Sequence, residues 1–208
     1  MVMTRTFTSS LCVLASLTTA AHAGYGVVEA TGAFQLPGGN SLTYVSEVGA
    51  AYNPTIQGYN FGSVDALAGQ TLLLQNWYFE NYAYNAGAGS NNWLSDSSNA
   101  TLRMVISQGA TQVSLTDFTL NQTSTAGNNR FWQLALLSRG TNVAAGLANG
   151  SYSVSYEVNY TYNIWDGSSA SVGSASTGAS TGTFTVVPAP GALALLGVAG
   201  LIGARKRR

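Results

Sequence analysis

Reactive residue types are scarce in this 208-residue chain, and most of them lie at its two ends. Cys12, His22 and Lys206 are the sole members of their types, and none of them falls between residues 24 and 187. Cysteine nucleophiles, Ser-His-Asp triads, histidine metal sites, Schiff bases and disulfides are therefore excluded from that central segment. Carboxylates, hydroxyls and three arginines remain, so a glycan hydrolase using two carboxylates is the least favoured alternative to a non-catalytic protein.

Tryptophan side chains are the second group that could bind a ligand, because sugar rings stack their C–H faces on indoles. Trp93 and Trp165 fall in or beside polar loops, where binding residues often lie, and they are the candidate glycan-binding residues. Trp77 and Trp132 fall inside predicted strands and are assigned to the core. Ordinary packing is the simpler interpretation for each of the four.

Oxygen ligands near two loop acids could in principle hold Ca²⁺. Asp96 and Asp166 are those acids, and Asn91, Asn92 and Asn99 lie nearby in the sequence. The spacing of a calcium-binding loop is absent, so these acids are interpreted as solvated loop residues. We expect no metal and no cofactor.

The charge of the central segment is strongly unbalanced. Residues 24–187 contain three basic residues (Arg103, Arg130 and Arg139) against all eight acidic ones, a formal charge of −5. This segment contains no basic patch, so nucleic acids and anionic membrane surfaces are poor partners for it.

The N-terminal residues resemble a secretory signal. Arg5 precedes a short apolar stretch at residues 11–17, and the small residues Ala21 and Ala23 flank His22. A basic region, a short apolar region and a small-x-small site define a signal peptide. We therefore expect residues 1–23 to be removed by cleavage after Ala23 and the protein to be exported.

The C-terminal residues have the order of a membrane stop. A Pro-x-Pro turn at 188–190 precedes an uncharged apolar run at 192–204, and the basic cluster 205–208 follows. Basic residues resist translocation, so the preceding chain lies on the far side of the membrane. Even counted from Gly191, the run covers only roughly 21 Å as a helix, whereas the hydrocarbon core is about 30 Å thick. A transient or processed anchor fits this length better than a permanent tail anchor.

This tripartite tail resembles the PEP-CTERM sorting signal of Gram-negative bacteria, with Ala189 in place of the usual Glu. The residues that carry the resemblance are Val187, Pro188, Ala189, Pro190, Gly191, Arg205, Lys206, Arg207 and Arg208. The resemblance implies cleavage near the Pro-x-Pro element by an exosortase-type transpeptidase, after transient anchoring in the inner membrane. It also implies a final place at the cell surface or outside the cell, in association with exopolysaccharide and biofilm matrix.

Period-two patterns predict β-strands through the central segment. Apolar and polar residues alternate without a break over residues 151–164, which indicates a strand with one buried and one wet face. The aromatic stretch 71–84 is also predicted as a strand. Residues 24–34 are predicted to be a lead-in of small residues that ends in a strand, and further strands are predicted at 42–48, 101–107, 112–120, 130–137 and 183–187.

Two local predictions concern connections. Residues 101–107 and 112–120 are expected to form a hairpin with a glycine in the bend. In its second arm Val113, Leu115 and Phe118 are expected to face the core, with a bulge between Leu115 and Phe118. The Gly/Ser-rich stretch 167–182 is expected to be a long hairpin loop or, as the alternative, a flexible linker to the membrane.

These elements predict three parts: a signal peptide (1–23), an all-β body (24–187) and a sorting signal with a short membrane helix (188–208). The body is expected to be a single antiparallel β-sandwich, jelly-roll or Ig-like. The function expected first is that of an exported, non-catalytic surface or matrix protein. A carbohydrate-binding module of the cell surface is the alternative.

Overall fold

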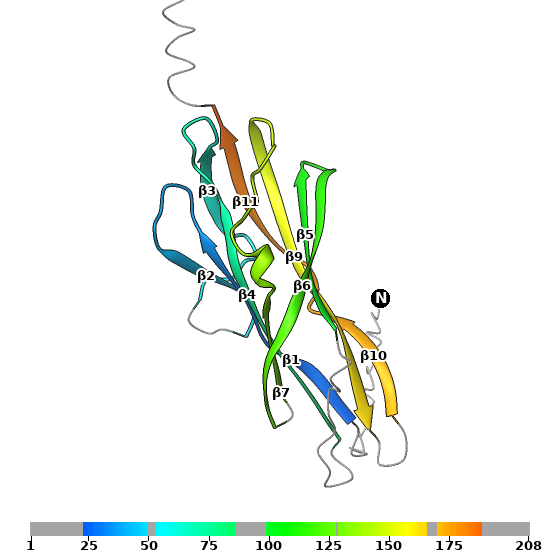
Figure 1. Ribbon diagram of the computed structural model, residues 1–208. Helices are drawn as coiled ribbons and strands as arrows, with labels where there is room; N and C mark the ends of the chain where they lie inside the picture. Colours follow the sequence, from blue (N-terminus) through cyan, green and yellow to red (C-terminus); the bar gives the residue numbers. More distant parts are fainter. Residues whose placement is uncertain (1–22, 50–52, 86–98, 128, 166–169, 189–208) are drawn as a thin grey trace, which may run out of the picture.

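The computed structural model describes residues 23–49, 53–85, 99–127, 129–165 and 170–188, and these residues are nearly all in β-strands (Figure 1). The strands are β1 (Ala23–Gln35), β2 (Leu42–Val48), β3 (Asn60–Asp65), β4 (Leu73–Asn85), β5 (Ala100–Gln108), β6 (Thr111–Ala126), β7 (Asn129–Leu134), β8 (Thr141–Asn142), β9 (Gly150–Trp165), β10 (Ala170–Ser176) and β11 (Ser180–Val187). A short 3₁₀ turn, η1 (Leu136–Ser138), is the only helical element among them. The all-β prediction is confirmed.

All of these strands belong to one hydrogen-bonded sheet that curls strongly (Figure 1). Its order is β2-β1-β4-β7-β6-β5-β9-β11-β3, with β10 also paired to β9 and β8 to β4. The ladders are antiparallel except that β3 lies parallel to β11, so the sheet is mixed rather than purely antiparallel as expected. Parallel pairing is possible here because a long stretch of chain separates β3 from β11, whereas strands joined by a short hairpin must be antiparallel.

The two ends of the curled sheet are brought together by the segment between β2 and β3. Ile56 donates its backbone N–H to the carbonyl of Ser46 in β2, and Gly58 donates to the carbonyl of Thr181 in β11. The same short segment therefore contacts both β2 and the β11–β3 end of the sheet. This closure leaves fewer backbone groups of the end strands unpaired.

The core lies between parts of the sheet that are not neighbours in strand order. Tyr156 of β9 meets Phe34 of β1 and Trp77 of β4, with ring centroids 5.5 and 5.2 Å apart. Phe79 of β4 lies 5.1 Å from Tyr160 of β9 in the same way. Contacts across the curl bury the apolar faces of β1, β4 and β9 against one another, which is the main source of stability in such a fold.

Several local predictions are confirmed. Strand β2 has the expected bounds. In β9 the even-numbered residues from 152 to 162 are buried, and the odd-numbered residues between them are more exposed to solvent. The β5–β6 hairpin turns through Gly109, whose φ of 59° is in the region that glycine adopts easily. Trp77 and Trp132 are core residues.

The prediction that Val113 and Leu115 face the core is wrong. Their side chains are 43% and 48% exposed, whereas Phe118 is buried as expected. Ile106 pairs with Ser114 and Ser107 pairs with Gln112, so the bulge lies at Val113. The register is unbroken from Ser114 to Leu120, so the expected bulge between Leu115 and Phe118 is absent. Alternation therefore places Leu115 on the outer face when Phe118 faces the core.

Most described residues of the Gly/Ser-rich stretch 167–182 form strands, not the expected long loop or flexible linker. Residues 170–176 form β10, which pairs with the last part of β9, and β11 returns to pair with its first part. Pairing is possible because Gly173 leaves room for the ring of Tyr162, which a side chain there would strike. The expected return of the last strand to β9 is confirmed.

Candidate functional site

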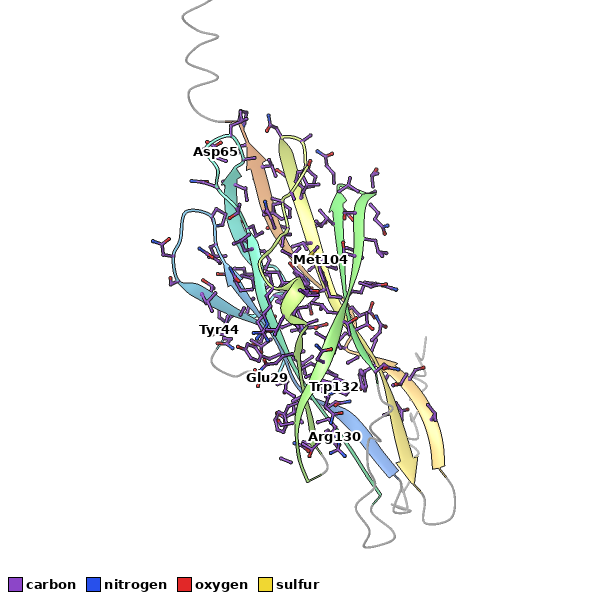
Figure 2. All side chains as sticks on the ribbon, viewed as in Figure 1. Glu29, Tyr44, Asp65, Met104, Arg130 and Trp132 are labelled. Atoms are coloured by element: carbon purple, nitrogen blue, oxygen red, sulfur yellow. The ribbon has the colours of Figure 1, made fainter. Side chains whose placement is uncertain are left out.

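The outer face of strands β1, β4, β7 and β6 carries a hollow of about 290 Å³. It is lined by Glu29, Tyr78, Phe79, Glu80, Thr123, Ser124, Phe131, Trp132 and Gln133. We call it the outer-face hollow. Figure 2 shows Glu29 and Trp132 close together in the middle of the molecule, with Tyr44 to one side on β2.

Register explains which side chains meet there. Glu29 pairs with Glu80 across β1 and β4, Glu80 pairs with Phe131 across β4 and β7, and Phe131 pairs with Ser124 of β6. Directly opposed residues of neighbouring strands point to the same face. The four side chains therefore form one row, in which two carboxylates lie beside an aromatic ring and a hydroxyl.

A second row follows two residues further along each strand. Thr31 of β1 pairs with Tyr78 of β4, which in turn pairs with Gln133 of β7. The ring of Tyr44 in β2 lies 6.4 Å from that of Tyr78 and is 41% exposed. The two rows together present aromatic rings, carboxylates and an amide over four adjacent strands.

Two bulges set the register of the first row. The shift between Val27 and Glu29 places Val28 out of the ladder, and Val28 is exposed. The shift between Gln122 and Ser124 does the same for Thr123, whose hydroxyl donates to the carbonyl of Phe131. Bulges commonly re-aim side chains at functional positions.

Hydrogen bonds hold each carboxylate by one oxygen. The hydroxyl of Thr31 donates to Oε1 of Glu29 at 2.7 Å, and Nδ2 of Asn129 donates to Oε1 of Glu80 at 2.6 Å. On the far side of the hollow, Nη2 of Arg139 donates to Oε1 of Gln133 at 3.0 Å. Each carboxylate is thus held at one oxygen by a neutral side chain.

The floor of the hollow is rigid because it is part of the core. Trp132 is 4% exposed, and its indole N–H donates to Oδ1 of the fully buried Asn81 at 2.9 Å. Buried polar groups that are paired in this way fix the positions of the strands that carry them. A ligand would therefore meet a preformed surface.

Two other hollows lie on the outer face of β9 and its neighbours. One, of about 310 Å³, is lined by Asn99, Thr101, Asn159, Tyr160, Thr161, Ser174 and Ala175. The other, of about 370 Å³, is lined by Asn60, Gly109, Ser151, Tyr152, Ser153, Thr183, Phe184 and Thr185. Neither has a charged side chain in its lining, so the outer-face hollow is the one with the chemistry to orient a ligand.

A second unusual carboxyl lies elsewhere, at the closure of the sheet. Glu47 is the extra residue of a bulge in β2, because Ala30 pairs with Val48 and Thr31 with Ser46. Its Oε1 accepts a hydrogen bond from the hydroxyl of Thr177 in the turn between β10 and β11. Burial raises the pKa of Glu47 to about 8; the Thr177 hydrogen bond lowers the pKa and the nearby Glu157 carboxylate raises it.

Most residues singled out in the sequence lie outside the described part of the chain. They include Ala21, Trp93, Asp96, Asp166, Ala189 and residues 190–208, together with the predicted membrane helix and residues 1–22 of the predicted signal peptide. Ala23 begins β1, and Val187 ends β11. Trp165 is the last residue of β9, and its side chain is not described. Asn99 lines the hollow beside β9. The proposed roles of Trp93 and Trp165 therefore stay predictions.

Sequence reasoning did not single out the residues of the outer-face hollow. Within the aromatic stretch 71–84, Glu80 is the only charged residue, and it directly follows three aromatic residues, Trp77, Tyr78 and Phe79. That contrast is the signal that could have indicated a functional position. Nothing local could have paired it with Glu29, because that pairing depends on a bulge in a distant strand.

Two structural searches are negative within the described part of the chain. No three His, Cys, Asp or Glu side chains of the described residues come together as metal ligands. Among the same residues, no helix has the length and apolar character to cross a bilayer.

Comparison with known proteins gives no assignment. No protein-family model matches this sequence, and the search of curated proteins finds no significant match. The fold and the outer-face hollow therefore define only a class, an all-β protein with a preformed hollow of aromatic and acidic side chains.

Proposed function

We propose that the protein is an exported, non-catalytic surface or matrix protein whose body binds carbohydrate at the outer-face hollow. The observation that carries the proposal is the row Glu29, Glu80 and Phe131 beside the second row with Tyr78 and Gln133. Aromatic rings stack on the C–H faces of sugars, and carboxylates and amides accept or donate hydrogen bonds at their hydroxyl groups. The hollow combines both kinds of contact on a rigid sheet.

Hydrolysis of a glycan is the less favoured function for the same hollow. Glu29 and Glu80 are direct neighbours on the same face of the sheet. A glycoside hydrolase instead needs an acid and a base or nucleophile that flank the scissile bond. Two side-by-side carboxylates fit recognition of one face of a sugar better than attack from the opposite face.

Export and sorting complete the proposal. We propose that residues 1–23 are a signal peptide and that the tail from Val187 resembles a PEP-CTERM signal because it serves as one. The run 192–204 would form a short membrane helix in the inner membrane until an exosortase-type enzyme releases the body. We further propose that the architecture is a β-sandwich. The supporting observation is that β9 packs face to face against β1 and β4 through Tyr156, Phe34 and Trp77.

The sorting proposal predicts the mass of the protein in its native host. Intact-mass analysis of the envelope and the medium is expected to find a species that runs from Gly24 to about Val187, with or without added sugar. Such a species would mean that both ends are removed. Recovery of the protein from the membrane fraction with residues 192–208 still attached would contradict processing and leave a tail-anchored protein.

The binding proposal predicts that the aromatic rings of the hollow are required. Replacing Tyr78 or Phe131 by Ala is expected to weaken binding to a surface polysaccharide of the native host about tenfold, or roughly 1.4 kcal/mol. The measurement is a pull-down titration with the full chain in mild detergent. Leu115→Ala, which removes an exposed apolar side chain remote from the hollow, is the matched control and is expected to bind as the wild type does.

Two further arms separate this hollow from the alternatives. If Trp93→Ala and Trp165→Ala abolish binding while Tyr78→Ala and Phe131→Ala do not, the loop tryptophans form the site and the hollow does not. Release of new reducing ends during the incubation, lost in Glu29→Gln and in Glu80→Gln, would indicate a hydrolase. Absence of binding to any glycan would contradict the proposed binding function.

A further inference from the structure

The two carboxylates of the outer-face hollow carry like charges at directly opposed positions of neighbouring strands. Glu29 and Glu80 are direct partners in the β1–β4 ladder. Like charges at directly opposed positions of neighbouring strands repel one another and destabilise the sheet. A positive group placed between the two would remove that repulsion and gain two charge-assisted hydrogen bonds.

The protein itself supplies no cation to this pair from the residues that line the hollow, none of which is Lys, Arg or His. Arg130 of β7 is adjacent in sequence to Phe131 but alternates with it, and its side chain is buried on the other face. Arg139 reaches Gln133 in the lining of the hollow, and its guanidinium donates there and to the carbonyl of Leu134. The hydrogen bonds that the carboxylates do accept come from the neutral side chains of Thr31 and Asn129.

Geometry favours a cation that is part of a sugar. The carboxylates lie in the same row as the ring of Phe131, and the ring of Tyr78 lies two residues away along β4. An ammonium group on a stacked pyranose ring would reach the carboxylates while the ring keeps its apolar contact. The formal charge of −5 on residues 24–187 would also attract a polycation over longer distances.

We infer that the ligand class of the outer-face hollow is an amino sugar polymer that carries free ammonium groups. The inference rests on the proposed carbohydrate-binding function and specifies its substrate. Glu29 and Glu80 are the residues that select the amine, and Tyr78 and Phe131 hold the ring. A fully N-acetylated polymer has the same ring but lacks the charge, so it is the natural comparison.

The test compares oligomers of β-1,4-linked glucosamine with N-acetylated oligomers of the same length. Binding to the full chain in mild detergent is measured by calorimetry at a pH where the amine is protonated. We expect the free-amine oligomer to bind at least about tenfold more tightly, because hydrogen bonds between charged groups are stronger than those between neutral ones. Added salt is expected to reduce this preference by screening.

Variants assign the preference to the carboxylates. Glu29→Gln and Glu80→Gln are each expected to weaken binding of the free-amine oligomer about tenfold and that of the acetylated oligomer by a smaller factor, because only the free-amine oligomer loses a charge-assisted hydrogen bond. Asp117→Asn is the matched control, because it removes one negative charge from β6 next to Arg103 and away from the hollow. Thermal unfolding checks that each variant is folded; relief of the Glu29–Glu80 repulsion should leave stability unchanged or higher.

The outcomes separate the inference from the function on which it rests. If both oligomers bind with equal affinity and the Gln variants bind as the wild type does, the ammonium specificity is overturned while carbohydrate binding stands. If Asp117→Asn weakens binding as much as the Gln variants, the preference comes from net charge and not from the hollow, and the inference is overturned. If neither oligomer nor any host polysaccharide binds, both proposals fail.

Discussion

The free energy of unfolding is expected to fall as the pH rises from about 5 to about 9, by roughly 4 kcal/mol, and Glu47 is expected to cause most of this loss. The reason is the environment of its carboxyl group. Burial raises the pKa of Glu47 from 4.5 to about 8, with a further raising effect from Glu157. Thr177 donates a hydrogen bond to one of its oxygens, while the other oxygen is buried and has no partner among the described residues.

The sign follows from proton linkage. Between the unfolded pKa of 4.5 and the folded pKa of about 8, the folded chain binds more protons at Glu47 than the unfolded chain does. The stabilisation is therefore complete below pH 4.5 and is lost as the pH rises through about 8. Above that pH the folded protein must hold a buried charge where β2 meets the β10–β11 turn.

Urea unfolding of the full chain in mild detergent, at several pH values between about 5 and 9, measures the effect. Glu47→Gln keeps the hydrogen-bonding shape without the charge, so its stability should be nearly independent of pH in that range and exceed that of the wild type at the alkaline end. Asp117→Asn is the control, because Arg103 lowers the pKa of Asp117 and any contribution from Asp117 is lost only at acidic pH. A Glu47→Gln variant that retains the wild-type pH dependence would contradict the assignment.

Two substitutions of Tyr156 are expected to change stability in opposite directions. Tyr156→Ala should lower the free energy of unfolding by about 3–5 kcal/mol, as is typical when a large buried aromatic is truncated. Tyr156 is completely buried and contacts Phe34 and Trp77 across the core. Tyr156→Phe should instead raise it by about 1–2 kcal/mol, because the hydroxyl is buried without a partner in the described part of the chain.

The matched control is Tyr152→Phe, on the same face of the same strand. The hydroxyl of Tyr152 donates to the carbonyl of Ala148 at 2.7 Å, so its removal should lower stability by about 1 kcal/mol. Equilibrium unfolding of the three variants beside the wild type provides the measurement. Equal and negative effects of Tyr152→Phe and Tyr156→Phe would show that the Tyr156 hydroxyl has a partner and that its burial carries no cost.

Where a strand follows strict alternation, its bounds and buried face were predictable from the residues alone. Strand β9 is the clearest case, since every even residue from Tyr152 to Tyr162 is buried. Where the apolar residues of a strand do not keep one alternation, prediction failed. Leu115 and Phe118 are an odd number of residues apart in an unbroken part of β6, so only Phe118 faces the core, and the bulge lies at Val113 instead of between them.

The Gly/Ser-rich stretch shows a second limit. Its composition is typical of a linker, and yet residues 170–176 form a strand. The small side chains are accommodated because β9 offers its backbone as a template and the ring of Tyr162 covers Gly173. Context of this kind overrides propensity in strands.

By itself, the sequence determined that the body is all-β and that it contains no thiol, imidazole or amine for catalysis, because composition and period-two patterns are local properties. Only the tertiary structure decided which side chains share a surface. Glu29 pairs with Glu80 because a bulge in β1 shifts the register. Glu47 accepts a hydrogen bond from Thr177 because the curl of the sheet brings β2 close to the turn between β10 and β11. Register and curl depend on contacts between segments that are distant in the chain, and such contacts leave no mark in the local sequence.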